Sequence, residues 1–305
     1  MGSMTRFVPK YNSSQATAFA PAHISGFFQP FIDPDDDLRS GSSGAGLCVS
    51  KGCISTIQIK ESSKQSMHIR VNGQRSDLSI VNHCLSLLLE QALLQITVDI
   101  EVELPWSQGF GMSGAGCLSA AYALCECLGL PKIQALHAAH RTEVQFRTGL
   151  GDVMASYHGG VELRIKPGVL SQGYIRKIPG DIDLVLCITG DPMNTKDVLT
   201  NEEQMDIIQT SGKTCIDALV AQPGIDRFFD LSWKFTQETG LATQKILDAV
   251  TAVRQVGQAS MCMLGNAVFA TGEPKKVSDA LKPYGPIIHL TTESKGARLL
   301  TEFTS

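Results

Sequence analysis

The segment 105-PWSQGFGMSGAG-116 dictates how the first half of this chain must fold. A β-prone run, Ile96–Leu104, leads into it and an alanine-rich run, Cys117–Leu128, leads out of it, so the sequence predicts a strand, a glycine loop and a helix. The glycines let the backbone take positive φ and let a ligand approach closely. The free amide groups at the start of a helix, and the positive end of its dipole, attract anions. This order of elements therefore predicts a phosphate-binding site.

Three other interpretations of this loop fit the residues less well. Gly109–Gly114 satisfies the GxGxxG pattern of dinucleotide-binding proteins, but the ~30 residues that follow read as helix and not as the βαβ unit that such a site needs. A Walker loop needs Gly-Lys-Ser or Gly-Lys-Thr, and the chain contains neither. A plain turn before a packed helix explains the small residues but not Ser107 and Ser113.

Composition narrows the class of protein. With 305 residues the chain is long for one domain, and its 43% hydrophobic and 18% charged residues are ordinary for a soluble globular enzyme. The net charge of −4 gives no electrostatic reason to bind nucleic acid or an anionic membrane. The sequence lacks an apolar run of about 18 residues. Nine cysteines with mostly apolar neighbours indicate reduced thiols and a cytoplasmic protein.

A second informative stretch, residues 142–167, carries acidic residues beside glycines. Asp152 follows two glycines after a predicted helix, which suggests exposure in a cleft, and Glu143 lies on that helix. Two simpler explanations stay open at this level. Glu143 could pair with Arg147 at i, i+4, and Asp152 could cap a helix over Val153–Tyr157.

The segment Arg39–Gly46, RSGSSGAG, is a second run of small residues. It could be a flexible linker. It could also be a loop that binds an anion, in which the arginine makes two hydrogen bonds to a carboxylate or phosphate. Before it we expect a short strand over Thr17–Gly26. After it we expect a hairpin within Leu47–Glu61 that turns at Lys51-Gly52.

A loop-rich connection over Gly168–Ile182 marks the expected domain boundary. The predicted domains are residues 4–168, which contain the phosphate loop and the acidic residues, and residues 183–305. After the connection, the pattern predicts a strand, three helices, two strands joined by a turn at Gly265, a helix and a last strand. This order favours an α+β second domain with an antiparallel sheet.

Three segments in this order resemble the GHMP kinases, the superfamily of galacto-, homoserine, mevalonate and phosphomevalonate kinases. They are Ala20-Pro-Ala-His23, the PxxxGxGxSGA pattern of Pro105–Ala115, and Asp152 followed by Gly159-Gly160. Within this superfamily the archaeal pantoate kinases are the most similar. The stretches that carry this closer resemblance are FAPAHISGFF, RSGSSGAG, TGLGDVMASYHGGVELRIKPG and SMCMLGNAVFA. The resemblance covers nearly all of Thr17–Gly272.

The resemblance implies a two-domain α+β GHMP kinase fold, with an N-terminal mixed α/β nucleotide-binding domain and a C-terminal domain of antiparallel sheet and helices. It implies an enzyme that uses ATP and Mg²⁺ to phosphorylate the 4-hydroxyl of pantoate, giving 4-phosphopantoate in coenzyme A biosynthesis. A kinase for homoserine or mevalonate, and a non-catalytic nucleotide-binding sensor on the same fold, stay open as alternatives. A homodimer is also a possible oligomeric state of such an enzyme.

The resemblance also assigns roles to single residues. Ser113 and Glu143 match the residues that ligate Mg²⁺, and Asp152 matches the acid that takes the proton from the substrate hydroxyl. His23 stands where mevalonate kinases have a lysine, so a permanent charge near the transferred phosphoryl group is lost. Asp152 and His23 are thus the expected catalytic residues. The residues expected to bind ATP are Pro105, Gly109, Phe110, Gly111, Met112, Ser113, Gly114, Ala115 and Gly116.

Pantoate carries a carboxylate, so a basic group must meet it. Arg39 is our first choice and Arg147 our second, because a guanidinium grips a carboxylate through two hydrogen bonds. Phe27, Phe28 or Met154 could form the apolar wall for the gem-dimethyl group. The residues expected to bind the substrate are His23, Arg39, Ser40, Ser42, Arg147, Asp152 and Gly265.

Overall fold

A long hairpin of two strands runs through the molecule and organises the rest of it. The structure is a computed structural model that describes residues 11–89, 92–169, 172–193 and 202–300. Strand β1 (Gln15–Phe31) pairs antiparallel with β2 (Gly41–Glu61) along its whole length. The strand predicted over residues 17–26 is therefore too short, because pairing with β2 continues past both of its ends.

Residues 41–46 belong to β2 and form neither the flexible linker nor the loop that the sequence left open. Their small size has a packing reason. Gly44 lies against β1, where a Cβ atom would overlap the carbonyl oxygen of Phe27. Gly46 lies over His23, where a Cβ atom would overlap the imidazole ring. Small residues thus let two strands and a buried ring approach closely.

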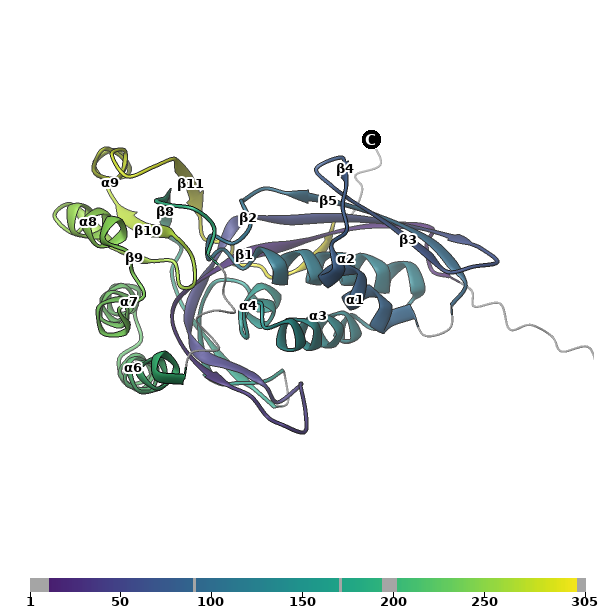
Figure 1. Cartoon of the computed structure of the whole chain (residues 1–305), viewed down its shortest axis with the longest axis horizontal. Helices are drawn as coiled ribbons and strands as arrows, with labels where there is room; N and C mark the ends of the chain where they lie inside the picture. Colours follow the sequence, from purple (N-terminus) through teal and green to yellow (C-terminus); the bar gives the residue numbers. More distant parts are fainter. Residues whose placement is uncertain (1–10, 90–91, 170–171, 194–201, 301–305) are drawn as a thin grey trace, which may run out of the picture.

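The prediction of a turn at Lys51-Gly52 is wrong as well, since β2 continues through these residues. The pairing register shifts here. Pro21 pairs with Gly52, whereas the next residue, Ala22, pairs with Val49. The two extra residues of β2 make a bulge, and a bulge bends a strand. Figure 1 shows the hairpin curving from the flat part of the sheet to its tip at residues 32–40.

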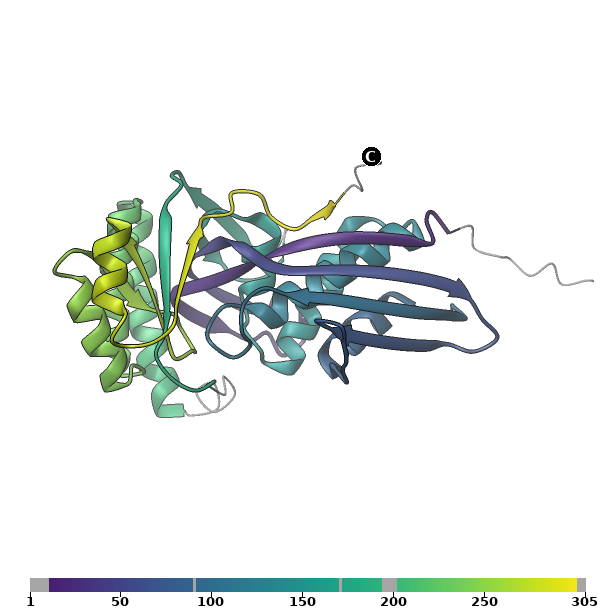
Figure 2. The same ribbon diagram turned by 90° about the horizontal axis from the view of Figure 1, so that it is seen from above.

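The hairpin carries the larger of two sheets, which has eight strands in the described part of the chain. β2 pairs with β5 on one side of the bulge and with β6 nearer the tip. Figure 2 shows the long strands side by side, with the yellow β12 next to β1. β7 lies in the connection predicted to be loop-rich. The strands added to the hairpin are β3 (Ser66–Val71), β4 (Gln74–Arg75), β5 (Leu94–Val102), β6 (Val161–Lys166), β7 (Tyr174–Ile178) and β12 (Arg298–Leu300).

Helices cover one face of this sheet (Figure 1). α2 packs directly on β1 and β2, while α1 and α3 pack on α2. Because α2 is enclosed on nearly all sides, its buried residues are mostly Ala, Gly, Cys and Leu. The helices of this layer are α1 (Ser79–Leu89), α2 (Met112–Leu128), α3 (Lys132–Phe146) and α4 (Asp152–His158).

The second sheet is antiparallel throughout, in the order β11-β8-β10-β9. Helices stack on it at one end of the molecule (Figures 1 and 2). This confirms the predicted α+β fold and the strand pair that turns at Gly265. The elements are β8 (Asp183–Ile188), α6 (Glu202–Ala221), α7 (Ile225–Thr239), α8 (Gln244–Val253), β9 (Gly257–Met261), β10 (Ala267–Gly272), α9 (Pro274–Leu281) and β11 (Ile287–Thr291).

The two layers meet along β1, which packs against α6 and α7 as well as against α2. Phe27 is fully buried here, with ring centroids 6.2 Å from Phe228 and 6.4 Å from Phe235. It is therefore a core residue of the junction. The division at residues 168 and 183 stays a prediction, since the chain changes sheet between β7 and β8 but returns to the first sheet with β12. In the described ranges, no helix combines the length and apolar character needed to cross a bilayer.

A glycine sets the distance between α6 and β1. A Cβ atom at Gly212 would overlap the carbonyl oxygen of Phe28. Exchange of Gly212 for alanine should therefore push the helix off the strand and lower the free energy of unfolding by about 1–3 kcal/mol, the usual effect of overpacking. Urea unfolding midpoints measure this change.

The matched control is Gly116→Ala in α2. A Cβ atom there would lie 3.4 Å from Trp106 Cη2 and 3.8 Å from Cys53 Sγ, which is ordinary contact. Because alanine favours helix by about 1 kcal/mol over glycine, this variant should be as stable as the parent or more so. Equal midpoints for the two variants would contradict the close packing of α6 on β1.

Candidate active site

The phosphate loop ends one residue before α2, and α2 begins at Met112, five residues earlier than predicted. Gly111 precedes the helix in a left-handed conformation with φ 61°, which glycine adopts without strain. Glycine has no side chain to cap the helix, so the first-turn amides have no side-chain acceptor. Met112–Gly116 are thus the first turn of the helix, and their N–H groups are available to an anion.

Asp152 sits against this first turn. A Cβ atom at Gly111 would lie 3.1 Å from Asp152 Cβ, and one at Gly114 would lie 3.2 Å from the same atom. Gly114 is therefore needed for the close packing of α2 on α4 and not for a flexible loop. The contacts place the Asp152 carboxyl group, which is part-exposed, beside the amides that would hold a phosphate.

A cavity of about 360 Å³ opens at this point. Both layers contribute to it, because Met263 and Leu264 come from the turn between β9 and β10. About half of the residues expected to bind ligands line it. They are Ser42, Gly109, Phe110, Gly111, Met112, Ser113, Arg147 and Asp152, together with Phe28.

Other expected residues lie outside the cavity lining. Gly265 packs against the loop, where a Cβ atom would overlap Gln108 and the Gly109 nitrogen. Ser40 is buried in the hairpin tip, and its hydroxyl accepts a hydrogen bond of 2.9 Å from the Asp33 amide. The remaining residues of this group are His23, Arg39, Pro105, Gly114, Ala115, Gly116 and Glu143.

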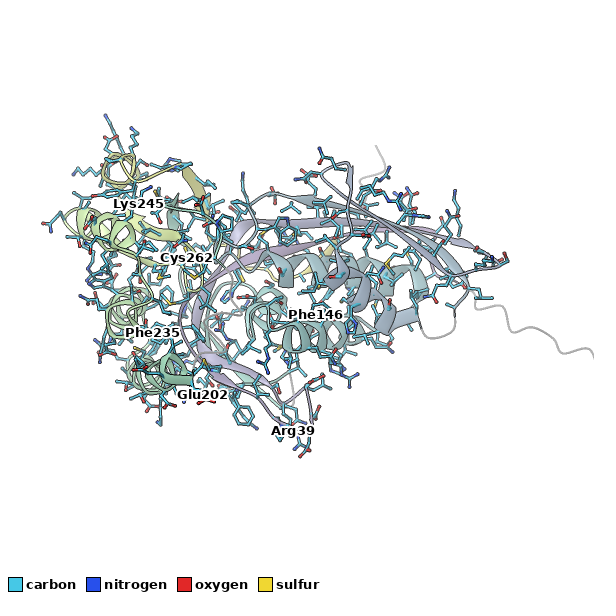
Figure 3. All side chains as sticks on the ribbon, viewed as in Figure 1. Arg39, Phe146, Glu202, Phe235, Lys245 and Cys262 are labelled. Carbon is cyan, nitrogen blue, oxygen red and sulfur yellow. The ribbon has the colours of Figure 1, made fainter. Side chains whose placement is uncertain are left out.

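Arg39 points away from the cavity. Its side chain is 57% exposed and lies 3.5 Å from Asp36 and 4.0 Å from Asp33. Figure 3 shows it at the tip of the β1–β2 hairpin. The reason is that residues 41–46 form a strand, which carries Arg39 to the far end of the hairpin and not to the entrance of a binding loop.

Arg147 is the cation that does reach the cavity. It ends α3 in a left-handed conformation with φ 53°. Among the described residues its guanidinium has no hydrogen bond or ion pair, and it does not pair with Glu143 as one simple explanation held. A cation without a protein partner in a cavity is suited to an anionic ligand.

Glu143 caps the helix that carries Asp152. Its Oε1 accepts hydrogen bonds of 3.0 Å from the Asp152 amide and 3.1 Å from the Val153 amide. Glu143 is 2% exposed, and its Oε2 has no hydrogen-bond partner among the described residues. Burial, followed by the like charge of Asp152, raises the pKa of Glu143 to about 8. The cap of α4 is thus Glu143, and Asp152 is free for another partner.

That partner is His23, which is fully buried on β1. Its Nδ1 lies 2.7 Å from Asp152 Oδ1, and its Nε2 lies 3.0 Å from Glu162 Oε1. Arg164 in turn donates to Glu162 Oε1 through Nη1, and its Nη2 is buried without a partner among the described residues. His23 therefore lies behind Asp152 and does not itself line the cavity.

Glu162 and Arg164 were missed from the sequence. A signal was present, however. Residues two apart on a strand share a face, and β6 carries a glutamate and an arginine at such positions between apolar residues. Two opposite charges on the inner face of a buried strand indicate a polar network.

Comparison with known proteins assigns the chain to a family. Residues 79–160 match the family model described as the GHMP kinases N terminal domain. The pantoate kinase of Methanospirillum hungatei is 32% identical over 292 residues, which cover 94% of this chain and 97% of that protein. The chain belongs to the pantoate kinase family of the GHMP kinases.

Two further relatives support the same family. The pantoate kinase of Thermococcus kodakarensis is 31% identical over 260 residues, covering 83% of this chain and 86% of that protein. A solved structure of a phosphotransferase related to the CoA biosynthesis pathway is 26% identical, with a TM-score of 0.86 and coverage of 95% and 100%. The predicted GHMP kinase fold and membership of a kinase family are thereby confirmed.

The residues at the site bear on whether a metal ion could bind there. No group of three or more His, Cys, Asp or Glu side chains in the described ranges could hold a metal ion. A magnesium ion needs fewer, because it usually keeps water and takes phosphate oxygens. Glu143 Oε2, which has no hydrogen bond among the described residues and lies 4.0 Å from His140 Nδ1, and the Ser113 hydroxyl in the cavity fit such a partial shell.

The raised pKa of Glu143 makes stability depend on pH. The pKa of Glu143 is about 8 in the folded protein, which is above its value in the unfolded chain. Between these two pKa values the unfolded chain releases the proton and the folded protein keeps it, so the free energy of unfolding falls as pH rises. Glu143→Gln keeps the capping oxygen and cannot ionise. In metal-free buffer, it should therefore gain stability relative to the parent between about pH 5.5 and 8.5.

Thermal unfolding of both proteins at the two pH values measures this difference. Glu238→Gln is the control, since that carboxylate is 43% exposed between α6 and α7. It should show no such pH-dependent gain. If Glu143→Gln also showed none, Glu143 would be ionised in the folded protein at neutral pH.

Proposed function

We propose that this chain transfers the γ-phosphoryl group of ATP to the 4-hydroxyl of pantoate, forming 4-phosphopantoate for coenzyme A biosynthesis. The observation that carries the proposal is the contact of Asp152 with the first turn of α2. It brings a carboxylate and a phosphate-binding helix start into one cavity, which phosphoryl transfer to an alcohol requires.

Asp152 is the proposed base. Its Oδ1 is held by His23, which leaves Oδ2 to face a substrate hydroxyl. A carboxylate within about 3 Å of the hydroxyl accepts its proton as the oxygen attacks phosphorus. The new O–P bond then forms while the bond from phosphorus to the β-phosphate oxygen breaks, so ADP leaves.

The phosphates of ATP would lie on Gly109–Gly116, the end of the loop and the first turn of α2. Its first-turn amides donate to phosphate oxygens, and the helix dipole favours their charge. Ser113 and Glu143 would hold Mg²⁺, for which the hydroxyl and the free Oε2 are suitable donors. When bound, Mg²⁺ neutralises charge on the phosphates.

The carboxylate of pantoate would pair with Arg147. This arginine lines the cavity and lacks a protein partner among the described residues. A second cation, Arg164, lies beneath the Ser42 carbonyl, to which its Nε donates at 3.3 Å. Phe28, which lines the cavity and is 4% exposed, offers an apolar wall for the gem-dimethyl group.

The cavity favours pantoate over homoserine. Homoserine carries an amine, which would need a carboxylate beside the arginine that binds its acid group. Asp152 is the sole acidic side chain among the described residues of the lining, and it is assigned to the hydroxyl. The presence of Ser113, Glu143 and Asp152 together argues against a non-catalytic sensor.

A coupled ADP-release assay with ATP and Mg²⁺ tests the proposed function. Pantoate, mevalonate, homoserine and pantothenate are offered in parallel, and we expect turnover with pantoate. Asp152→Asn should keep ATP binding but lower turnover by about 10²–10⁴-fold, the usual contribution of a general base. Turnover with another substrate, or near-parental turnover of the variant, would overturn the substrate or the base assignment respectively.

The carboxylate assignment is tested by two arginine variants. Arg147→Gln removes the free cation of the cavity, so the KM for pantoate should rise at least tenfold while the KM for ATP changes little. Arg39→Gln is the matched control, because this side chain is 57% exposed at the hairpin tip. A larger rise in the KM for ATP in Arg147→Gln would move Arg147 to the nucleotide.

A further inference from the structure

A continuous line of hydrogen bonds runs from the cavity into the core. It passes from Asp152 through both nitrogens of His23 to Glu162, with distances of 2.7 Å and 3.0 Å. Only Asp152 reaches the cavity, since His23 and Glu162 are both fully buried. The elements that meet here, α4, β1 and β6, are far apart in sequence.

The two carboxylates constrain the protonation of the ring. A carboxylate only accepts hydrogen bonds, so a ring nitrogen that faces one must carry a hydrogen. Both nitrogens of His23 face carboxylate oxygens. A neutral ring would place a lone pair against one of them, whereas an imidazolium donates to both.

The other charged and titratable groups around His23 set its charge balance. Arg164 on β6 pairs with Glu162, and its Nη1 is also 3.4 Å from His23 Nε2, where a guanidinium can only donate and so competes with the ring N–H for Glu162. Cys48 on β2 carries no charge, because burial and then the nearby Glu162 hold the pKa of its thiol well above the usual value. Two carboxylates and one guanidinium leave one negative charge, which an imidazolium balances.

The pKa of His23 reflects the same balance. Burial by itself lowers it, but the hydrogen bonds to Asp152 and Glu162 and their negative charges outweigh that effect, so the pKa lies above the ordinary histidine value.

We propose that Glu162 is a positioning residue that keeps His23 as an imidazolium, and that this buried cation keeps the Asp152 carboxylate turned toward the substrate hydroxyl. The proposal rests on the proposed function, in which Asp152 is the base. Glu162 touches neither substrate nor phosphate, and it acts only through His23.

The protonation of His23 is measured on the protein without any substrate. NMR of the chain with ¹⁵N-labelled histidine shows whether one or both ring nitrogens carry a hydrogen. At about pH 8, where an ordinary histidine with a pKa of about 6.5 is neutral, we expect both nitrogens of His23 to be protonated. In Glu162→Gln, which keeps the shape but not the charge, we expect one. A single tautomer in the parent protein would overturn the proposal even if the variant failed to fold.

Kinetics test the consequence for catalysis. Glu162→Gln should lower kcat about 10- to 100-fold, part of the range of general-base catalysis, with the KM values for ATP and pantoate changed less than about threefold. A role confined to stability would leave the kcat of the folded fraction unchanged.

A double-mutant cycle shows whether Glu162 affects catalysis through His23 or through Arg164. His23→Asn places an amide N–H near the Nδ1 position, where it still donates to Asp152 but no longer reaches Glu162. Adding Glu162→Gln to His23→Asn should then have no further effect on kcat. An additive effect would mean that Glu162 acts through Arg164 and would overturn the proposal. Glu238→Gln, which removes a carboxylate between α6 and α7, should keep the parental kcat.

The outcomes distinguish this proposal from the proposed function. If pantoate is not turned over but His23 is doubly protonated and loses a proton in Glu162→Gln, the substrate assignment fails and the protonation half of the inference stands. If pantoate is turned over and His23 is a single tautomer, the proposed function stands and the inference about Glu162 and His23 fails.

Discussion

The close contact between the first turn of α2 and the start of α4 is the constraint on which the rest of the site depends. Glycines at positions 111 and 114 remove the side chains that would hold the two helices apart, so Asp152 lies within van der Waals distance of the phosphate-binding turn. Glu143 then fixes the same junction from the other side by accepting the Asp152 and Val153 amides. Because one carboxylate oxygen caps the helix and the other accepts no hydrogen bond from a described residue, with His140 Nδ1 4.0 Å away, a single residue can position the base and contribute to a metal shell.

The acidic residues of the site differ in environment, and this gives them different tasks. Glu143 is buried beside a like charge, which raises its pKa, whereas Asp152 is part-exposed and hydrogen-bonded to an imidazole. The sequence resemblance implies a lysine of mevalonate kinases at the position of His23. Here the ring lies behind the base, not beside the phosphoryl group, so any cation it provides acts through Asp152. Burying such a group is costly unless every charge is paired, which explains why β6 supplies both Glu162 and Arg164 to the same network.

Local sequence predicted most elements correctly, and the errors share one cause. Alternation and turn residues located β5 and the helices that pack on the second sheet, because those signals depend on neighbours in sequence. Small residues were misread twice. The run after Arg39 suggested a loop but is a strand, and Met112–Gly116 suggested a loop but is the first turn of a helix. In both cases, glycine is required by a neighbour distant in sequence, Phe27 in one and Asp152 in the other, and no local pattern reports such a contact.

By itself, the sequence determined the order of elements from β8 to β11, the phosphate loop, the acidic residues at 143 and 152 and, through the resemblance, the family. These depend on spacing along the chain. Only the tertiary structure decided which cation faces the cavity, which acid caps α4, and that His23 links Asp152 to Glu162. The physical reason is that the periodicity of a strand or helix fixes the face on which a side chain lies, but not the residue that this side chain contacts. The partner is set by a register shift in the long hairpin and by glycine contacts between elements that are not neighbours in sequence.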